Sequence, residues 1–546
     1  MPAIFIDDLK AIQHHHGYLP ADEIQALSER RNIPLFEIHA VASFYPHFRL
    51  SPPPAVSIRV CQDMSCHLQG GRELFETLQD TLDGVGFDDW EIETVSCLGQ
   101  CDGAPAISIN DKSYTRVTLD GLAGYIEKLV EGRSLKRQKM RKREVDMRIE
   151  PYAETNACDV LKQYLDNQDA QSLIDTLKAS GLRGMGGAGF PTGVKWDLVR
   201  GTQADIKYVV CNADESEPGT FKDRQLLRSV PHLMIEGMIL GGLVIGATQG
   251  YVFLRHEYDL ERELIEKTIK RFYKDGLLGD HIMGSGVSFD LEIFDSPGGY
   301  ICGEETALLE ALEGKRAEPR NKPPFPGTHG LHGKPTLINN VETFSWIPAI
   351  LLHGAKWFTE FGANGATGLK YIALSGHVRK PGVYEIPLGT SVRDLIDQYG
   401  GGITEGRALK AFAPGGASSG FLPASMADIP LDFDALAKAG SMLGSGAVVA
   451  VAENTDMLDL ARNVVTFFRN ESCGKCVPCR SGTHQFVTML DQVLDGKGSE
   501  QTLDPVEDLA ETMAQTSICG LGQAAPIPVM SVLKYFPEEV KDYIEK

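Results

Sequence analysis

Apolar and polar positions alternate with two different periodicities along this chain, one typical of helices and one typical of strands. Apolar residues recur at helical spacing through residues 8–50, and again from about residue 456 to the end. Shorter runs with the alternation of strands lie at 55–62, 90–97, 206–213, 250–256 and 289–295. Strand-like runs separated by helical stretches are typical of α/β domains. The pattern therefore predicts two α/β units and a helical carboxyl end.

These periodicities divide the chain into five segments. The predicted order is a helical segment with a small α/β domain (1–131), a basic linker (132–150), a larger α/β domain (151–365), a second small mixed unit (366–455) and a helical segment (456–546). A single helix is expected over 67–82 in the small domain. The linker prediction rests on Gly132–Glu144, which is strongly basic and lacks an apolar face, so we expect it to be exposed.

One stretch, Leu233 to Leu254, is apolar over nearly the length of a membrane span. Glu236 and several glycines interrupt it, which favours a buried helix, a glycine turn at 247–250 and a strand. The first ten residues lack a basic start and a long apolar core, so no secretory signal is expected.

Composition and charge narrow the function further. Hydrophobic residues are 42% and charged residues 23%, as in soluble globular proteins, and the formal net charge is −21. So acidic a chain argues against non-specific binding to nucleic acid or to an anionic membrane. We expect a cytoplasmic protein with no nucleic-acid partner and no direct membrane insertion.

Eight of the eleven cysteines fall into two patterned groups. The second group reads C-x2-C-x2-C, with a fourth cysteine after a gap of thirty-nine residues. This spacing follows the ferredoxin rule for a [4Fe–4S] cluster, whereas structural zinc usually takes two separate pairs. Its members are Cys473, Cys476, Cys479 and Cys519.

The first group reads C-x4-C, then C-x3-C after thirty residues, and its cysteines lie at the ends of predicted strands. The spacing favours a [2Fe–2S] cluster and leaves zinc open. Disulfides are disfavoured in a cytoplasmic protein. The members are Cys61, Cys66, Cys97 and Cys101. We expect Cys158, Cys211 and Cys302 to be buried thiols.

Residues 181–193 form a loop with six glycines in thirteen positions. Such a loop lets backbone N–H groups approach a phosphate or a flat ring closely. It contains G-x-G-x-x-G, but a predicted helix precedes it instead of a strand, so the ordinary Rossmann fingerprint is not supported. Arg183 and Lys195 would neutralise a phosphate, and Phe190 would stack on an aromatic ring.

Three further segments, 212–224, 298–314 and 337–343, concentrate carboxylates and amides. Such groups bind ribose hydroxyls and the edges of flavin or nicotinamide rings. Helix capping is the alternative for any one segment, but it does not easily explain all three beside the glycine loop.

Together, GLRGMGGAGFPTGVKW, CNADESEPGTFKDR, YICGEETALLEALEG, KPPFPG, INNVET and SCGKCVPCRSG…SICGLG closely resemble the NADH-binding flavoprotein subunit of respiratory complex I. Related NAD-linked formate dehydrogenases and NAD-reducing hydrogenases share this core. The resemblance covers about 152–546. Residues 1–130, with GYLP, ASFYPHF and the first cysteine group, resemble the thioredoxin-like [2Fe–2S] subunit. The chain thus resembles a fusion of the two subunits.

The resemblance implies a thioredoxin-like [2Fe–2S] domain, a Rossmann-like FMN/NADH domain, a ubiquitin-like β-grasp domain of the SLBB type and a helical bundle carrying [4Fe–4S]. The implied cofactors are FMN, NAD(H) and the two clusters, with all eight patterned cysteines as ligands.

The resemblance also implies contacts to FMN and NADH. Glu217 and Glu305 are implied to tune access and release of NADH, since hydride transfer from nicotinamide to flavin needs no protein acid or base. The other implied contacts are Arg183, Gly184, Gly186, Phe190, Lys195, Asn212, Asp214, Glu215, Tyr300, Gly303, Glu304, Phe325, Asn339, Asn340 and Thr343.

The implied activity is that of a diaphorase subunit, most like the beta subunit of an NAD-dependent formate dehydrogenase. Its partner would then be a molybdenum or tungsten alpha subunit with an iron–sulfur chain. A diaphorase of an NAD-reducing hydrogenase and an NADH input module of a complex I-like quinone reductase are the alternatives. The fusion weighs against ordinary complex I, and no cysteine follows Cys519, where bifurcating hydrogenases often carry more. From another class, a non-catalytic iron–sulfur scaffold would bind no flavin, and the glycine loop argues against it.

Overall fold

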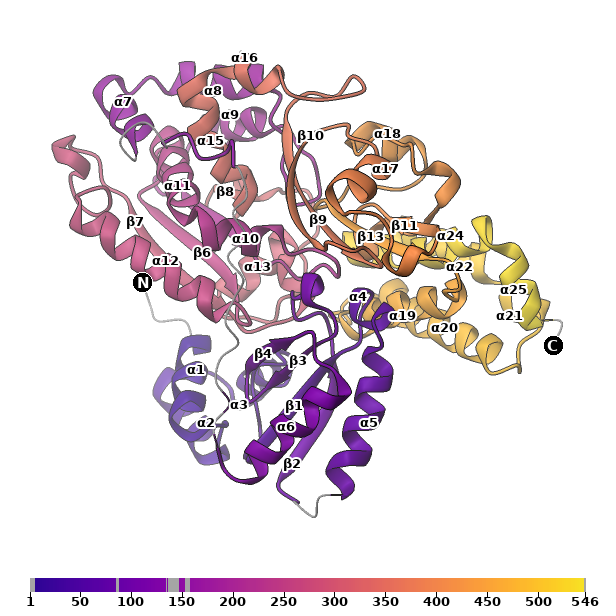
Figure 1. Cartoon of the computed structure of the whole chain (residues 1–546). Coiled ribbons are helices and arrows are strands. Elements are labelled where there is room, and N and C mark those ends of the chain that lie inside the picture. The colour runs from indigo at the N-terminus through magenta and orange to yellow at the C-terminus, as the bar shows by residue number, and fades with distance from the viewer. Residues whose placement is uncertain (1–4, 85–87, 134, 136–146, 153–157, 545–546) are drawn as a thin grey trace.

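The protein folds into four parts in the computed structural model (Figure 1). The structure describes residues 5–84, 88–133, 135, 147–152 and 158–544. In Figure 1 the N-terminal part (indigo to purple) lies below the largest part (magenta), and the orange sheet lies beside the yellow helices of the carboxyl end. The predicted mixture of α/β parts and a helical end is confirmed.

Three helices precede a four-stranded sheet in the N-terminal part. The elements are α1 (Phe5–His16), α2 (Ala21–Arg31), α3 (Leu35–Ala42), β1 (Val56–Cys61), α4 (Ser65–Leu68), α5 (Gly71–Gly84), β2 (Trp90–Val95), β3 (Ala106–Ile109), β4 (Lys112–Thr115) and α6 (Leu119–Val130). The strand order is β2-β1-β3-β4, with β1 parallel to β2 and antiparallel to β3. Leu74, Leu78 and Leu82 recur every four residues along α5, so one face of this helix is buried in the core of the sheet.

The single helix predicted over 67–82 is wrong, because the structure has two helices there. Gly70 lies between them with a φ of +83°, which ends α4. At Gly71 a Cβ atom would lie 2.9 Å from the carbonyl oxygens of both Cys61 and Cys66. The break thus folds the chain closely around the first cysteine pair.

The largest part is a parallel sheet with helices on both faces. Its elements are α7 (Asp159–Asn167), α8 (Ala170–Ser180), α9 (Thr192–Gly201), β5 (Tyr208–Ala213), α10 (Lys222–Ser229), α11 (Pro231–Ile245), β6 (Gln249–Arg255), α12 (Asp259–Lys274), β7 (Asp290–Ser296), α13 (Glu305–Leu312), α14 (Pro326–His329), β8 (Thr336–Asn340), α15 (Val341–His353) and α16 (Ala355–Thr359). The predicted strands β5, β6 and β7 are confirmed. β8 was not among the predicted strands, because its short sequence ends in two amides.

The strand order is β7-β6-β5-β8, and all the strands are parallel. From β5 the chain first adds β6 and β7 on one side and then returns to add β8 on the other side, so the order of addition switches between β5 and β8. At such a switch the connections leave the two strands toward opposite faces, which opens a crevice at their carboxyl ends. Ligands of open parallel sheets bind in that crevice. The residues that end β5 and β8 are therefore expected to line the ligand site.

Helix α11 occupies the apolar stretch that resembled a membrane span. It is buried on nearly every side, and Gly246 ends it with a φ of +80° before β6 begins. The predicted helix and strand are confirmed, and the turn lies at 246–248, slightly earlier than predicted. Across the described ranges no single helix is long and apolar enough to cross a membrane. Helices α10 and α11 reach that length and apolarity only together, and they are bent by 94° at the break between them.

Most of the predicted basic linker lies outside the described residues. Of its described residues, Gly132 and Arg133 are exposed, whereas Leu135 and Ile149 are buried. Arg148 pairs with Glu385 at 3.1 Å. The prediction of an exposed segment is therefore confirmed at residues 132–133 and wrong at Leu135.

The third part is a five-stranded sheet and the fourth is helical. Their elements are β9 (Leu369–Gly376), β10 (Gly382–Pro387), α17 (Val392–Asp394), β11 (Leu409–Ala413), β12 (Leu422–Pro423), α18 (Phe433–Lys438), β13 (Ala447–Ala452), α19 (Met457–Asn470), α20 (Val477–Leu494), α21 (Glu500–Leu503), α22 (Val506–Thr516), α23 (Gly520–Ala524), α24 (Ile527–Tyr535) and α25 (Pro537–Ile544). The sheet order is β10-β9-β13-β11-β12, with β9 parallel to β13. One buried cluster extends from α1 and α2 through the largest part to α19 and α20.

Candidate functional site

The crevice at the switch between β5 and β8 brings together the amides predicted as flavin contacts. Asn212 and Asn340 are paired in register at the ends of the two strands. The Asn212 Nδ2 donates to the Gly303 carbonyl at 2.8 Å. The Asn340 Oδ1 accepts from the Glu342 N–H at 2.9 Å and so caps α15. All three predicted segments, far apart in the sequence, therefore meet here.

The glycine loop closes one side of this crevice. The Gly184 N–H donates to the Phe190 carbonyl at 2.8 Å, which folds the loop back on itself. The Met185 N–H donates to the Thr343 Oγ1 at 2.9 Å. At Gly186 a Cβ atom would lie 3.0 Å from the Cβ of Asn340. Glycine is thus required for the close approach of the loop to the end of β8.

The side chains next to the loop are held by the backbone of β8 and its neighbours. The Lys195 Nζ donates to the Ile338 carbonyl at 3.1 Å, and burial lowers the pKa of this lysine. The Trp196 Nε1 donates to the buried Asn339 Oδ1 at 3.1 Å. Arg183 stacks over the Phe433 ring at 4.5 Å, so α18 of the third part supports the loop.

In the acidic loop after β5, Asp214 has a free acceptor atom, whereas Glu215 is fully hydrogen-bonded. Asp214 Oδ1 is buried and has no hydrogen-bond partner among the described residues. Burial raises the pKa of Asp214 to about 7. Both oxygens of Glu215, by contrast, are occupied: they accept from the N–H groups of Asp223 and Arg224, at 2.8 and 2.9 Å, and from the Tyr258 hydroxyl at 2.9 Å. Glu215 therefore caps α10 from inside the protein.

Glu217 lies at the boundary with the third part of the protein. Its carboxylate accepts from the Tyr300 hydroxyl at 2.5 Å and from the Ser418 N–H at 2.7 Å. Burial raises the pKa of Glu217. The Tyr300 ring packs edge-on against Phe467 of α19, with ring centres 5.1 Å apart. Sequence reasoning missed Ser418, which comes from a loop with no distinguishing pattern.

An ion-pair triad and two exposed aromatic rings belong to segments that adjoin Asn212, the glycine loop or β8, and we call them the mouth of the crevice. Lys322 donates to both Glu304 and Glu305 at 2.8 Å. Glu304 also caps α13 through the Thr306 and Ala307 N–H groups. Phe190 is 44% exposed and Phe325 is 57% exposed, which is unusual for large apolar side chains. The predicted NADH contacts in this group are thus accessible at the surface.

A buried charge network behind the crevice was missed by sequence reasoning. Lys222 pairs with Asp223 at 2.6 Å and with Glu342 at 3.0 Å, and Lys370 of β9 pairs with Glu342 at 3.2 Å. The Lys370 Nζ also donates to the Met185 carbonyl of the glycine loop at 3.4 Å. Burial lowers the pKa of Lys370 to about 8. A lysine inside an otherwise apolar strand run was the one available signal.

The first cysteine group lies in two loops at strand ends, as predicted, and all four thiols are buried. The Sγ atoms of Cys97 and Cys101 are 3.4 Å apart. Hydrogen bonds from Cys101 and Cys61 hold the pKa of the Cys97 thiol well below its usual range. Hydrogen bonds with Cys66 and Cys97 hold the pKa of Cys61 well above it. The four sulfurs therefore form one contiguous group.

The second cysteine group lies where two helices begin. Cys476 precedes α20, Cys479 lies in its first turn, and Cys519 precedes α23. At Gly522 a Cβ atom would lie 2.8 Å from the Cβ of Cys479, so α23 packs directly on α20. Burial raises the pKa of Cys479 to about 12 and that of Cys519 to about 11. The remote fourth cysteine is thus brought to the triplet. The unpatterned Cys158, Cys211 and Cys302 are buried, as predicted.

These donor sets fit the implied cofactors. Over the described part of the chain, no three His, Cys, Asp or Glu side chains are placed to share one metal ion. Cluster ligands need no such arrangement, because the four cysteines of a [2Fe–2S] or [4Fe–4S] cluster surround several irons. In the crevice, the unpartnered acceptor of Asp214 suits a hydroxyl of the FMN ribityl chain.

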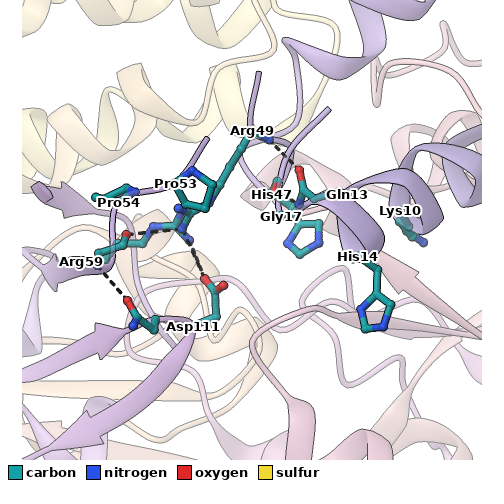
Figure 2. A pocket seen from close by; sticks show the side chains of 12 residues that line it. Lys10, Gln13, His14, Gly17, His47, Arg49, Pro53, Pro54, Arg59 and Asp111 are labelled. Atoms are coloured by element: carbon teal, nitrogen blue, oxygen red, sulfur yellow. Dashed lines mark hydrogen bonds and ion pairs between the residues drawn. The ribbon is translucent and has the colours of Figure 1, made fainter. Parts of the chain in front are cut away.

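A separate hollow lies between α1 and the first sheet (Figure 2). Its volume is about 360 Å³. Arg49 and Arg59 face it, and both are paired: Arg49 with Glu91 at 3.4 Å, and Arg59 with Asp111 at 3.3 Å. The hollow shares no lining residue with the crevice, and its arginine charges are already neutralised.

Comparison with known proteins accounts for all four parts. Residues 177–349 match the Nuo51 FMN-binding domain, 459–543 the iron–sulfur binding region of NADH-ubiquinone oxidoreductase F, 2–130 the thioredoxin-like [2Fe–2S] ferredoxin and 371–422 the SLBB domain.

Full-length relatives agree with these matches. The NADP-reducing hydrogenase subunit HndC of Solidesulfovibrio fructosivorans is 43% identical over 73% of this chain and 81% of its own length. The F subunit of the NADH-quinone oxidoreductase of Escherichia coli (strain K12) is 40% identical over 73% of this chain and 90% of its own. A crystal structure of an NAD+-reducing [NiFe]-hydrogenase in the air-oxidised state superposes with a TM-score of 0.88 at 31% identity, over 98% of this chain and 93% of that chain.

Fold and site together define an iron–sulfur flavoprotein that reacts with NAD(H). The chain belongs to the family that comprises the F subunit of NADH-quinone oxidoreductase and the diaphorase subunits of NAD-reducing hydrogenases, with the thioredoxin-like [2Fe–2S] domain fused to it. Its cofactors are FMN, NADH, one [2Fe–2S] and one [4Fe–4S] cluster, so the zinc alternative for the first cysteine group falls away. A formate-oxidising partner is not indicated by these relatives.

Proposed function

We propose that this chain is the NAD+-reducing subunit of a complex whose partner oxidises a small electron donor at a metal centre. The observation that carries the proposal is the likeness to an NAD+-reducing [NiFe]-hydrogenase chain over 98% of this chain, the [2Fe–2S] part included. The NADH-quinone oxidoreductase F subunits of Rhizobium meliloti and Escherichia coli match 71% and 73% of it. A quinone reductase is therefore the less favoured assembly.

Two electron donors are proposed for the partner subunit. Formate, oxidised at a molybdenum or tungsten centre of an alpha subunit, is the donor implied by the family resemblance of the sequence. Hydrogen is the second candidate, and the hydrogenase likeness is the specific observation in its favour. The chain itself would supply neither reaction, because its cysteine groups and crevice are taken up by clusters, flavin and nicotinamide.

The residues of the crevice then have distinct tasks. When bound, FMN exchanges a hydride with NAD(H) and single electrons with the iron–sulfur clusters. We propose that the glycine loop, Asn212 and Asn340 orient the flavin. The exposed rings of Phe190 and Phe325 would hold the nicotinamide by stacking.

The carboxylates are proposed to act at different distances from the nucleotide. Glu305, paired with Lys322 at the mouth, would control entry and release of NADH. Glu217 would act less directly, because Tyr300 and Ser418 already donate to its carboxylate. The cysteine groups would hold the two clusters that carry electrons to and from the flavin.

The donor is tested on the complex that co-purifies with this chain. NAD+ reduction is measured with formate and with H2, and metal content is determined on the same sample. Formate-dependent activity with molybdenum or tungsten supports the first candidate, and H2-dependent activity with nickel supports the second. If neither donor works while NADH still reduces an artificial acceptor, the NAD+-reducing proposal gives way to a quinone reductase.

The proposed role of Glu305 in the entry and release of NADH is tested by Glu305→Gln in the same complex. Loss of the 2.8 Å pair with Lys322 is expected to change the KM for NADH by about threefold, the size of a partly exposed ion pair. Glu318→Gln removes a carboxylate that pairs with Arg316 instead of Lys322, and it should leave KM unchanged. Unaltered KM and kcat in Glu305→Gln would contradict the proposed role.

A further inference from the structure

Two buried arginines of the flavin-binding part hold the loop that carries Cys97 and Cys101. Arg224, on α10, donates to the Gly99 carbonyl at 2.5 Å and to the Asp102 carboxylate at 2.6 Å. Arg255, the last residue of β6, donates to the Cys97 carbonyl at 2.8 Å. Both side chains are 2% exposed.

The fit between the two parts is tight at this loop. Gly99 has a φ of +67°, and a Cβ atom there would lie 2.8 Å from the Tyr258 hydroxyl and 3.2 Å from Nη1 of Arg255. Nη1 of Arg255 also donates to the carbonyl of Glu215, in the acidic loop of the flavin crevice. One guanidinium thus bridges the backbone beside a cluster ligand and the backbone of the nucleotide site.

The Arg255 charge is paired with Glu257, but the guanidinium is the member of the pair that donates to the Cys97 carbonyl. Its Nε and Nη2 donate to the two oxygens of Glu257, at 2.9 and 2.8 Å. Glu257 is 21% exposed, so solvent screens the carboxylate more than it screens the guanidinium. The buried side of the pair, which faces the cysteine loop, is therefore positive.

We propose that Arg255 is a positioning residue that raises the reduction potential of the [2Fe–2S] cluster. One-electron reduction adds one negative charge to the cluster, and no bond forms or breaks. A buried positive charge, and hydrogen bonding beside a ligand, favour that more negative state. The proposal concerns the potential of the cluster and does not depend on which donor feeds the complex.

The test is a potentiometric titration of the holoprotein, followed by the EPR signal of the reduced [2Fe–2S] cluster. In Arg255→Gln the balance between reduced and oxidised cluster is expected to shift about tenfold toward the oxidised form, a midpoint about 59 mV more negative. Arg255→Lys keeps the charge and should shift the midpoint less. Glu257→Gln removes the counter-charge and should make the midpoint more positive.

A matched control separates charge from loop contact. Arg116 is exposed and donates to the Asp102 carbonyl at 2.9 Å, on the same loop, and Arg116→Gln should leave the midpoint unchanged. The [4Fe–4S] signal of each sample serves as an internal reference. An unchanged midpoint in Arg255→Gln with full spin count, or shifts of the same sign in Arg255→Gln and Glu257→Gln, would overturn the proposal. Should Arg255→Gln fail to retain its cluster, Glu257→Gln decides: a midpoint that does not rise overturns the proposal.

Discussion

At the scale of single residues, Glu236 is a carboxyl group placed inside an apolar helix. It is completely buried in α11, where it accepts from the Tyr152 hydroxyl at 2.7 Å and from the Leu161 N–H at 3.0 Å. Burial raises its pKa from 4.5 to about 7. Folding therefore favours the protonated form of this group.

This shift predicts a pH-dependent stability. Between about pH 4.5 and pH 7 the folded chain holds a proton that the unfolded chain releases, so the contribution of Glu236 is present below that range and lost as the pH rises through it. Glu236→Gln should have a free energy of unfolding like that of the parent near pH 4.5 and a higher one, by up to about 3 kcal/mol, above pH 7, which melting curves at the two pH values measure. Glu538→Gln, at an 82% exposed carboxylate, should show no growing gap. Parallel curves for Glu236→Gln and the parent would contradict the prediction.

A second residue-scale prediction concerns the cysteine assignments. Cys479→Ser should remove the [4Fe–4S] cluster and lower the iron content from about six atoms to about two, leaving [2Fe–2S] and FMN in place. Cys158→Ala, at a buried cysteine outside both groups, should keep the full iron content. Iron analysis and EPR of purified protein measure both. Retention of the [4Fe–4S] cluster, with about six iron atoms per chain, in Cys479→Ser would refute this ligand assignment.

At the scale of elements, glycines decide how closely the helices of the largest part approach each other. At Gly237 of α11 a Cβ atom would lie 2.2 Å from the Phe344 carbonyl oxygen of α15. Backbone on both sides cannot move aside cheaply, so the two helices touch without side chains between them. The carboxyl end of β8, which carries Asn339 and Asn340, leads directly into α15. The helix contact therefore positions the crevice.

We expect Gly237→Ala to lower the free energy of unfolding by about 1–3 kcal/mol, because the added methyl group must push α15 away. Gly124 is a helix-interior glycine of α6, and a Cβ atom added there would meet nothing within 4 Å. Gly124→Ala should instead be neutral or stabilise by up to about 1 kcal/mol. Thermal melts of both variants test this. Equal melting temperatures for the two would show that the helix contact tolerates a side chain.

At the scale of the whole molecule, the N-terminal part is held to the rest at both of its cysteine loops. Asn463 of α19 donates to the Gln62 carbonyl at 2.7 Å and accepts from the Met64 N–H at 3.0 Å. The hydroxyls of Ser65 and Ser375 lie 2.9 Å apart. The loop with Cys61 and Cys66 is thus attached to the helical part and to the third sheet, while the arginines hold the other loop.

Asn463→Ala should loosen this attachment. It leaves the Gln62 carbonyl and the Met64 N–H without their partner, which costs about 1–3 kcal/mol locally. Hydrogen exchange at residues 62–69 should become faster, with FMN content unchanged. Asn470→Ala, at an exposed position of the same helix, is the control. Equal protection of residues 62–69 in Asn463→Ala and the parent would argue that other contacts suffice.

The sequence determined several features of this protein by itself. The spacing of Cys473, Cys476 and Cys479 indicated a cluster because neighbours in sequence stay within a few ångströms of one another. The glycine loop and the strand runs of β5, β6 and β7 were equally local signals. The fold class and the cofactors followed from such patterns and from the family resemblance they support.

Only the tertiary structure decided which distant charges meet. Lys222 and Lys370 come from two different elements and both pair with Glu342 of a third inside the protein. Arg255 reaches the Cys97 loop across 158 residues of sequence. Such pairings depend on how helices and sheets pack, and one sequence records the residues but not their distances. Burial then fixes their energetics, because a charge that solvent would screen in a loop acts strongly once it is enclosed.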